Sequence, residues 1–440
     1  PVDGLPVSTA VRQQVLLART SIVSDGAGGA VIAWRDNRND SDMFAARVLA
    51  NGQVDPAWTA NGIAIVSAPA AQFNGTIASD GHGGLFAVWQ DRRNGPDSDI
   101  YMQHMLVTGA RAAGWPVDGV PVCTENGLQS FPTLSTDTEG GVFVSWEDQR
   151  GSSTDIFAHH IRGDGTLAPD WPVAGLPVCT SVGNQTRPQI LQDDDGGAFL
   201  AWTDARAGAI PSLYAQHVLG SGSLDPLWPA TDLNFCAVFG SHLNLILIPD
   251  LAGGALAVWD DSRSGLNIYA HHLLLHGAAD PAWPVNGRGV CTATNSQNSD
   301  GAAIPDGSGG LFSTWIDSRT LGTTGADIYA QRVQANGTLG GSVLDVPHGR
   351  TAGLDLAPLA PTPARADRLG LRYTLPRAGQ VRLELLDVAG RMLAAHDLGV
   401  QGAGPHAYDW APRTCIAAGL QFVRLRFGGD TRTVRAVIVE

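Results

Sequence analysis

The sequence predicts an all-β protein with three parts: a six-bladed β-propeller over residues 1–346, a linker over 347–362 and an Ig-like β-sandwich over 363–440. Three observations lead to this prediction. A Trp-x-Asp-x-Arg motif recurs six times, Gly-rich turns and short apolar runs follow the same period, and the strand that the last repeat lacks is found at the start of the chain.

The motif is the strongest signal because its period is nearly constant. Its tryptophans are separated by 55, 57, 56, 57 and 56 residues. A period of ~40–60 residues with four strands in each unit is typical of propeller blades. The six copies are Trp34, Asp36 and Arg38; Trp89, Asp91 and Arg93; Trp146, Asp148 and Arg150; Trp202, Asp204 and Arg206; Trp259, Asp261 and Arg263; and Trp315, Asp317 and Arg319.

Each repeat reads as four short strands, and the second repeat is the clearest example. Its first strand ends in the Gly-rich turn at 80–84, where glycine supplies the positive φ of a tight hairpin. The apolar second strand covers 85–89 and ends at the motif tryptophan. The third strand covers 99–105, and a second tryptophan, Trp115, leads into the fourth strand at 116–124.

The two ends of the array predict how the ring closes. The sixth repeat lacks the second tryptophan and the fourth strand, whereas residues 1–9 match residues 116–124 almost residue for residue. We therefore expect the N-terminal strand to complete the last blade, which removes two exposed sheet edges.

The repeat resembles the TolB-type, WD40-like propeller repeat. The resemblance rests on the Pro305-Asp-Gly turn, the strand 311–315, the Asp317-Ser-Arg hairpin, the Ile328-Tyr pair and closing Cys-Thr pairs such as Cys179-Thr180. It covers about residues 1–346 and implies a propeller. The additional Trp-Pro loop and the Asp-x-Arg segment depart from that family, so its partner binding is not carried over.

Residues 347–362 change in character and are rich in proline, which indicates a linker. Alternating apolar patterns return beyond it, at 369–375, 381–388 and 422–427. This stretch resembles the FlgD Ig-like and secretion-system C-terminal domain family through Tyr373-Thr-Leu-Pro, 379–391, Gly404-Pro-His, Trp410 and 419–425. The resemblance implies an Ig-like fold with a role in export, surface retention or assembly.

Composition excludes several kinds of function. All 28 basic residues are arginine and the formal net charge is −14, so no Schiff-base or phosphate-loop lysine exists and nucleic-acid binding is not expected. No apolar run approaches the ~20 residues of a transmembrane helix. The chain opens in the middle of a repeat, which suggests a mature exported form. We expect an extracellular or cell-surface protein of a bacterium.

The repeated residues have both a functional and a structural interpretation. The Asp-x-Arg pairs could form a ligand-binding ring, but equal repetition favours loop capping and ion pairing, because a catalytic site breaks ring symmetry. Repeated tryptophans more often fill the space between blades than stack on sugars. The turn aspartates are attributed to turn chemistry, not calcium; they are Asp25, Asp80, Asp137, Asp195, Asp250 and Asp306.

Histidines recur at one third-strand position, as His104, His160, His217 and His272, and are expected to be solvated or hydrogen-bonded. Four cysteines recur in the fourth strands and are expected to be buried free thiols, because equivalent sites in different blades lie too far apart for disulfides; they are Cys123, Cys179, Cys236 and Cys291. The sequence predicts no metal site, no cofactor and no catalytic residue.

These observations favour a secreted structural or interaction protein that is not an enzyme. Its partners would be proteins or further copies of the chain, and strand or domain exchange between copies would give filaments. The alternative is a carbohydrate-binding or carbohydrate-cleaving propeller, because paired carboxylates can come from distant strands.

Overall fold

The computed structural model describes residues 4–439 except 18, 39, 194, 209, 300–301, 321, 323–324, 341–354, 359–363, 366–368, 376, 388–390, 403, 411–418 and 429. The chain divides into two compact units, residues 1–340 and 341–440. Regular structure in the described residues is almost entirely antiparallel β-sheet, with one 3-10 turn, η1 (Pro56–Trp58). Within those residues, no helix has the length and hydrophobicity needed to cross a membrane.

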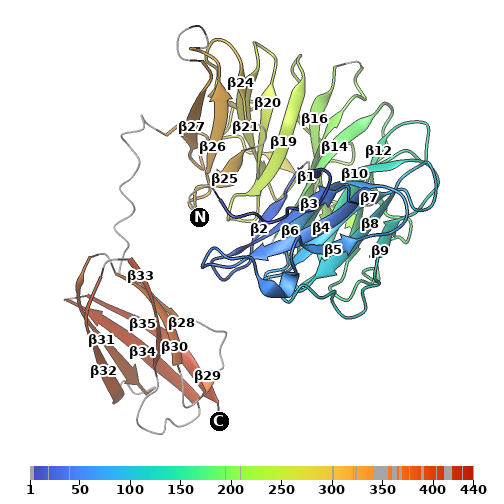
Figure 1. The fold of residues 1–440 in the computed structure, drawn as a ribbon. Coiled ribbons are helices and arrows are strands. Elements are labelled where there is room, and N and C mark those ends of the chain that lie inside the picture. The colour runs from blue at the N-terminus through green and yellow to red at the C-terminus, as the bar shows by residue number, and fades with distance from the viewer. Residues whose placement is uncertain are drawn as a thin grey trace. The chain divides into compact units, whose positions relative to one another are not determined.

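The first unit contains six sheets that follow one another along the chain (Figure 1). The first sheet contains β1 (Gln14–Leu16), β2 (Ile22–Ser24), β3 (Ala30–Asp36), β4 (Asp42–Val48) and β5 (Ile63–Val66). The second contains β6 (Gln72–Ser79), β7 (Leu85–Asp91), β8 (Asp99–Met105) and β9 (Val120–Cys123). The third contains β10 (Gln129–Thr136), β11 (Val142–Asp148), β12 (Asp155–Ile161) and β13 (Leu176–Cys179).

The remaining sheets of this unit repeat the pattern. The fourth contains β14 (Gln185–Gln192), β15 (Ala198–Asp204), β16 (Ser212–Leu219), β17 (Ser223–Leu224) and β18 (Leu233–Cys236). The fifth contains β19 (His242–Pro249), β20 (Ala255–Asp261), β21 (Asn267–Leu274), β22 (Ala278–Ala279) and β23 (Arg288–Cys291). The sixth contains β24 (Gln297–Asn298), β25 (Ala303–Pro305), β26 (Leu311–Asp317) and β27 (Asp327–Val333).

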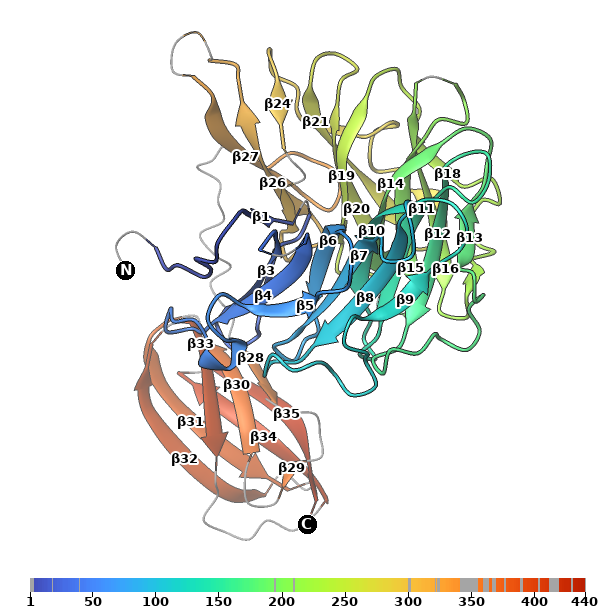
Figure 2. The ribbon, with the colours of Figure 1, turned by 45° about the vertical axis from the view of Figure 1, so that its right-hand side comes forward.

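Neighbouring sheets pack face to face, and each junction from the first sheet to the sixth has its own apolar core. In the junction between the second and third sheets, Phe86 and Val88 pack with Val144 and Trp146. The second tryptophans also connect neighbours, since the Trp115 indole donates to the Gly163 carbonyl at 2.9 Å. Sheets stacked around a common centre in this way make the first unit β-propeller-like (Figure 2).

The predicted closure by residues 1–9 is not found. Residues 4–9 form no strand, and among the described residues β27 pairs only with β26. The N-terminal segment is held by the first sheet instead, where Val7 packs near Trp34 and Phe44 and the Thr9 N–H donates to Asn61 Oδ1 at 2.7 Å. In these contacts Val7 and Thr9 lie against the first sheet, and neither bonds to β27. Residues 1–3 lie outside the described residues.

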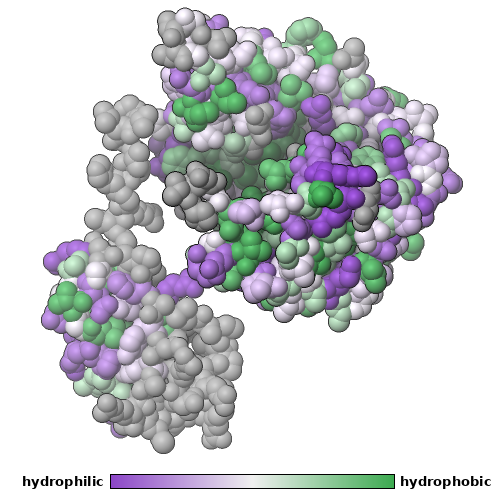
Figure 3. All heavy atoms as spheres, viewed as in Figure 1, coloured by the Kyte–Doolittle hydropathy of each residue, from purple (hydrophilic) through white to green (hydrophobic). Residues whose placement is uncertain are grey.

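The first and sixth sheets consequently keep apolar side chains in solvent. Phe312 of the sixth sheet is 39% exposed, whereas its counterpart in the second sheet, Phe86, is 1% exposed. Ile328 is 75% exposed and Ile22 of the first sheet 58%. Figure 3 shows a hollow on this side of the first unit, with apolar side chains along its wall.

The second unit contains two sheets. One contains β28 (Asp355–Pro358), β30 (Leu369–Leu375) and β33 (Gly404–Trp410). The other contains β29 (Ala364–Arg365), β31 (Gly379–Leu386), β32 (Met392–Gln401), β34 (Gly419–Phe427) and β35 (Asp430–Val439). Side chains of both sheets form one core, which includes Leu356, Leu371, Trp410 and Leu425.

The predicted linker 347–362 therefore needs a correction. Residues 355–358 form β28, which pairs with β30, and Leu356 is 4% exposed within the core. Proline-rich composition indicated a linker, but Pro358 belongs to β28, an edge strand of its sheet, where a missing N–H is tolerated.

Candidate functional site

The six Trp-x-Asp-x-Arg motifs form one contact pattern, repeated in every sheet of the first unit. Each aspartate is fully buried and accepts three hydrogen bonds: from the motif tryptophan indole at 2.8–3.0 Å, from the arginine backbone N–H at 2.8–3.0 Å and from the arginine Nη2 at 2.6–2.7 Å. The guanidinium also lies 3.9–4.1 Å from the centre of an aromatic ring in the third strand.

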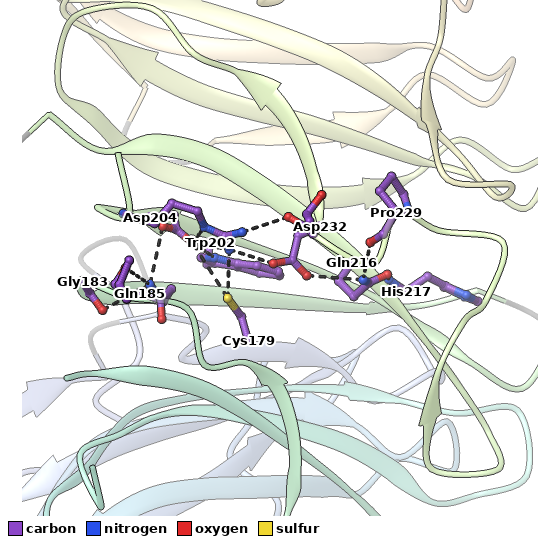
Figure 4. A network of polar contacts seen from close by, with 12 residues as sticks. Cys179, Gly183, Gln185, Trp202, Asp204, Gln216, His217, Pro229 and Asp232 are labelled. Carbon is purple, nitrogen blue, oxygen red and sulfur yellow. Dashed lines mark hydrogen bonds and ion pairs between the residues drawn. The ribbon is translucent and has the colours of Figure 1, made fainter. Parts of the chain in front are cut away.

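Figure 4 shows this arrangement in the fourth sheet. Trp202 Nε1 donates to Asp204, and Arg206 Nη2 donates to both Asp204 and Cys179 Sγ of the preceding sheet. The motif carboxylates are thus enclosed by protein donors. These contacts favour the structural interpretation of the motif over a ring of ligand-binding aspartates. The structural interpretation stays a prediction.

The recurring third-strand basic residues pair with the turn aspartates. His104 contacts Asp80 at 3.1 Å and His160 contacts Asp137 at 2.6 Å, while Arg47 takes the same role for Asp25. In the fourth sheet the turn residue is Asp193, not the predicted Asp195. Asp193 Oδ1 accepts the N–H groups of Asp195 and Gly197, because the hairpin register, not the Asp-Asp-Asp composition, selects the capping residue.

The four repeated cysteines are buried and unpaired. Burial raises the pKa of Cys123 and of Cys179 to about 12, so these thiols stay protonated and unreactive at neutral pH. Cys415 lies outside the described residues.

The residue directly after the motif tryptophan differs from repeat to repeat, unlike the rest of the motif. We call its place in the motif the variable position. This position holds Arg35, Gln90, Glu147, Thr203, Asp260 and Ile316. The inner strands of neighbouring sheets pack on one another around the centre of the unit, β6 on β10, β10 on β14 and β14 on β19. At this position Gln90, Glu147 and Asp260 bond to residues in or next to the inner strand of the next sheet.

Four inner strands contain a bulge, and two of these bulges bond to a variable-position side chain of the preceding sheet. The pairing register shifts there, and one residue other than glycine takes a positive φ: Asn74 (49°), Phe131 (48°), Arg187 (58°) and Asn244 (51°). Gln90 accepts the N–H of Phe131 at 3.2 Å and Glu147 accepts that of Arg187 at 2.8 Å. Positive φ at Phe and Arg is uncommon, and such strain is concentrated at functional sites.

We call Arg19, Phe131, Glu147 and Arg187 the central cluster. Arg19 comes from the first sheet and donates to the Pro188 carbonyl of the fourth sheet at 3.1 Å, so it spans the centre of the unit. Glu147 is 5% exposed, Phe131 is 45% exposed and the Arg187 side chain is exposed. Burial raises the pKa of Glu147, although the N–H of Arg187 and the charge of Arg19 act in the opposite direction.

A second carboxylate, that of Asp260, occupies the variable position of the fifth sheet. Asp260 is fully buried and accepts from Asn244 Nδ2 at 2.8 Å and from the Ser299 hydroxyl at 2.5 Å. The central cluster therefore combines a carboxyl group whose pKa is raised by burial, two cations and an accessible aromatic face. Such a set can transfer a proton to a hydroxylated substrate that stacks on the ring.

The sequence analysis did not single out this cluster, and its prediction of no catalytic residue stays a prediction. The available signal was the variable letter inside an otherwise constant motif, where the residue type differs in all six repeats.

No family model matches the chain, and no curated protein matches it. Among solved structures, a thermostable family-43 glycoside hydrolase is 8% identical over 67% of this chain and 99% of its own, with a TM-score of 0.37. An α-L-arabinanase of Penicillium chrysogenum is 11% identical over 70% of this chain and 90% of its own, with a TM-score of 0.37. A family PL25 ulvan lyase is 9% identical over 84% and 92%, with a TM-score of 0.46.

All three are carbohydrate-cleaving enzymes, and the expectation of a non-enzymatic structural or filament-forming protein finds no support among these structures. That prediction rested on equal repetition of the motif, and it overlooked the unequal position inside the motif. At these scores and identities the neighbours carry no argument about the activity of this chain, which must come from its own side chains.

Proposed function

We propose that the first unit binds and cleaves a glycan at the central cluster, with Glu147 as the proton donor. The observation that carries the proposal is the environment of Glu147. This side chain is buried, and the burial raises its pKa. The charges of Arg19 and Arg187 act on it, and the variable position of the fourth sheet holds a threonine and no carboxylate. A carboxyl group with a raised pKa keeps its proton to a higher pH and can protonate a departing glycosidic oxygen.

The neighbouring side chains supply the other requirements of glycan binding. Phe131 presents an accessible ring on which a sugar face can stack. Arg187 and Arg19 offer donors to hydroxyl or carboxylate oxygens. Asp260, held by Asn244 and Ser299, is the candidate for the second carboxylate of a cleavage reaction.

A polysaccharide panel tests this proposal directly. The full chain is incubated with arabinan, xylan, galactan and uronate-containing polymers, and new reducing ends and unsaturated products are measured. We expect cleavage of at least one polymer and a loss of about 100-fold or more in Glu147→Gln. Glu139→Gln, in an exposed turn, is the matched control and should keep full activity. Absence of cleavage across the panel, or full activity in Glu147→Gln, would show that the proposal is wrong.

We also propose that the first unit is a closed six-bladed propeller in which residues 1–9 join the edge of β27. Val7 and Thr9 already contact the first sheet as fourth strands contact the next sheet elsewhere. Thr9 N donates to Asn61 Oδ1, as Ser67 N donates to Asp118 Oδ1 and Ala237 N to Asn286 Oδ1. Closure would bury Phe312, Ile316 and Ile328, whose counterparts in the other sheets are enclosed.

Hydrogen exchange tests the closure. In a closed ring the backbone N–H groups along the outer edge of β27 exchange as slowly as those of β8 and β12, and deletion of residues 1–9 makes them fast. Fast exchange at β27 in the full chain would contradict closure.

For the second unit we propose an Ig-like sandwich of the FlgD type and an extracellular location. The supporting features are the two sheets around one core and the motif at 379–391. Detection of the chain in culture medium or on intact cells, with a cytoplasmic marker absent, tests the location.

A further inference from the structure

The fifth sheet departs from its neighbours at one buried position. The inner strand begins with glutamine in the other sheets, at Gln14, Gln72, Gln129, Gln185 and Gln297, and each of these pairs in register with the motif aspartate. In the fifth sheet the residue is His242, which pairs with Asp261. This replacement places an imidazole beside a repeated cysteine and a repeated aspartate.

Three possible metal-ligand atoms converge there. His242 Nε2 lies 3.3 Å from Cys236 Sγ and 3.4 Å from Asp261 Oδ2, and the sulfur and the carboxylate oxygen are 4.0 Å apart. A tetrahedral zinc ion with ordinary bond lengths places such ligand atoms about 3.4–3.6 Å from one another. The spacing of the three atoms therefore suits zinc with little movement.

The imidazole is already oriented as a ligand. His242 Nδ1 lies 2.9 Å from the Pro211 carbonyl oxygen, which can only accept, so Nδ1 carries a proton and donates it. Nε2 is thereby directed at Cys236 and Asp261. A carbonyl that holds the distal N–H is the usual support of a metal-bound histidine.

We propose that Cys236, His242 and Asp261 form a buried site for a zinc-class divalent cation. The cysteine belongs to the fourth sheet and the other two ligands to the fifth, so the ion would connect two sheets. All three residues are at most 2% exposed, so the ion would be loaded during folding. This differs from the sequence prediction of no metal.

Arg263 is the group at the site that must move when the ion binds. Its Nη2 contacts Cys236 Sγ at 3.2 Å and Asp261 Oδ2 at 2.6 Å, and Trp259 Nε1 donates to the same oxygen at 2.8 Å. An ion bonded to both ligand atoms takes the place of Nη2, while Asp261 Oδ1 and the Tyr269 ring can still hold the rest of the guanidinium. Thiolate and carboxylate together balance the two charges of the ion, and a water molecule has to supply the fourth ligand.

The repeat supplies a matched control. Cys179, Gln185 and Asp204 have the same places between the third and fourth sheets, with Cys179 Sγ 3.9 Å from Asp204 Oδ2, but with glutamine where the fifth sheet has histidine (Figure 4). His242→Gln restores the residue of the other sheets, so it should fold normally. Gln185→His should create a second site.

The experiment measures metal bound by the full chain after refolding with zinc and removal of free ions. We expect about one zinc per chain in the wild type, almost none in His242→Gln and about two in Gln185→His. Refolding with Co²⁺ should give a thiolate-to-cobalt charge-transfer absorption that Cys236→Ser lacks. Circular dichroism verifies that each variant is folded. A wild-type chain without zinc, or a His242→Gln chain with as much as the wild type, would overturn the proposal.

Discussion

The carboxylate of Glu147, in the third sheet, accepts the backbone N–H of Arg187, in the fourth, at 2.8 Å. One hydrogen bond thus connects the variable position of one repeat to the bulge of the next. It fixes the carboxyl group against the inner strand and holds Arg187 at φ 58°. The site is therefore a property of neighbouring repeats and not of any single one.

Replacing Arg187 by alanine removes a cation near Glu147 but keeps the N–H that Glu147 accepts. Burial is the main cause of the raised pKa of Glu147, and the Arg187 charge opposes it. In Arg187→Ala the pKa should rise further, so the alkaline limb of the kcat profile moves to higher pH, while KM rises about tenfold from the lost contact. Arg162→Ala, on an exposed loop, should change neither. An unmoved alkaline limb in Arg187→Ala would contradict the role of Glu147.

Asp91 should be essential for stability because its partners are buried with it. It accepts from Trp89 Nε1 at 2.8 Å and from Arg93 Nη2 at 2.6 Å. Asp91→Ala leaves the Trp89 indole N–H without its acceptor and removes the carboxylate from Arg93, so it should lower the free energy of unfolding by about 3–5 kcal/mol, measured by urea denaturation. The exposed Asp97→Ala should change it by less than about 0.5 kcal/mol. Equal effects of the two changes would exclude the structural interpretation of the motif.

Asp193 should contribute to stability against acid. Burial alone would raise its pKa, but hydrogen bonds from His217 and from the N–H groups of Asp195 and Gly197 outweigh burial and lower it. A lowered folded pKa means that the contribution is complete above about pH 4 and is lost as the pH falls through the folded value.

The stability difference between the wild type and Asp193→Asn should therefore shrink as the pH falls from about 5 to about 2. Denaturant unfolding at several pH values measures it. Asp195→Asn, two residues further along the same turn but exposed, should show no such dependence. The reverse result would restore the sequence assignment of Asp195 as the turn residue.

The repeated cysteines should react only after unfolding. Burial raises the pKa of Cys123 and Cys179 to about 12, and all four repeated thiols are enclosed. In a Cys415→Ser background, a thiol reagent at pH 8 should give almost no reaction with the folded chain and about four equivalents in guanidinium. Rapid reaction of the folded chain would contradict the burial of these side chains.

Features that depend on near neighbours in the chain were readable from the sequence. The apolar run before each motif tryptophan predicts a buried strand, and the structure has β7 at 85–91 where the pattern predicts 85–89. Prediction from the sequence was less successful where two neighbouring residues could serve equally well in the same structural role. Asp193 and Asp195 have the same chemistry, and only the hairpin register distinguishes them. Leu356 looked like part of a linker because its partner strand, β30, lies more than ten residues away.

The sequence by itself determined the repeat: six units, their strands and the buried Trp-Asp-Arg contacts, all of which are formed within about 60 residues of chain. Only the tertiary structure decided where the unlike residues meet. Arg19, Glu147 and Arg187 are separated by dozens of residues, and His242 meets a cysteine of the preceding sheet. The physical reason is that stacking sheets around a centre brings one position of every repeat together, and no local pattern records which side chains will face one another there.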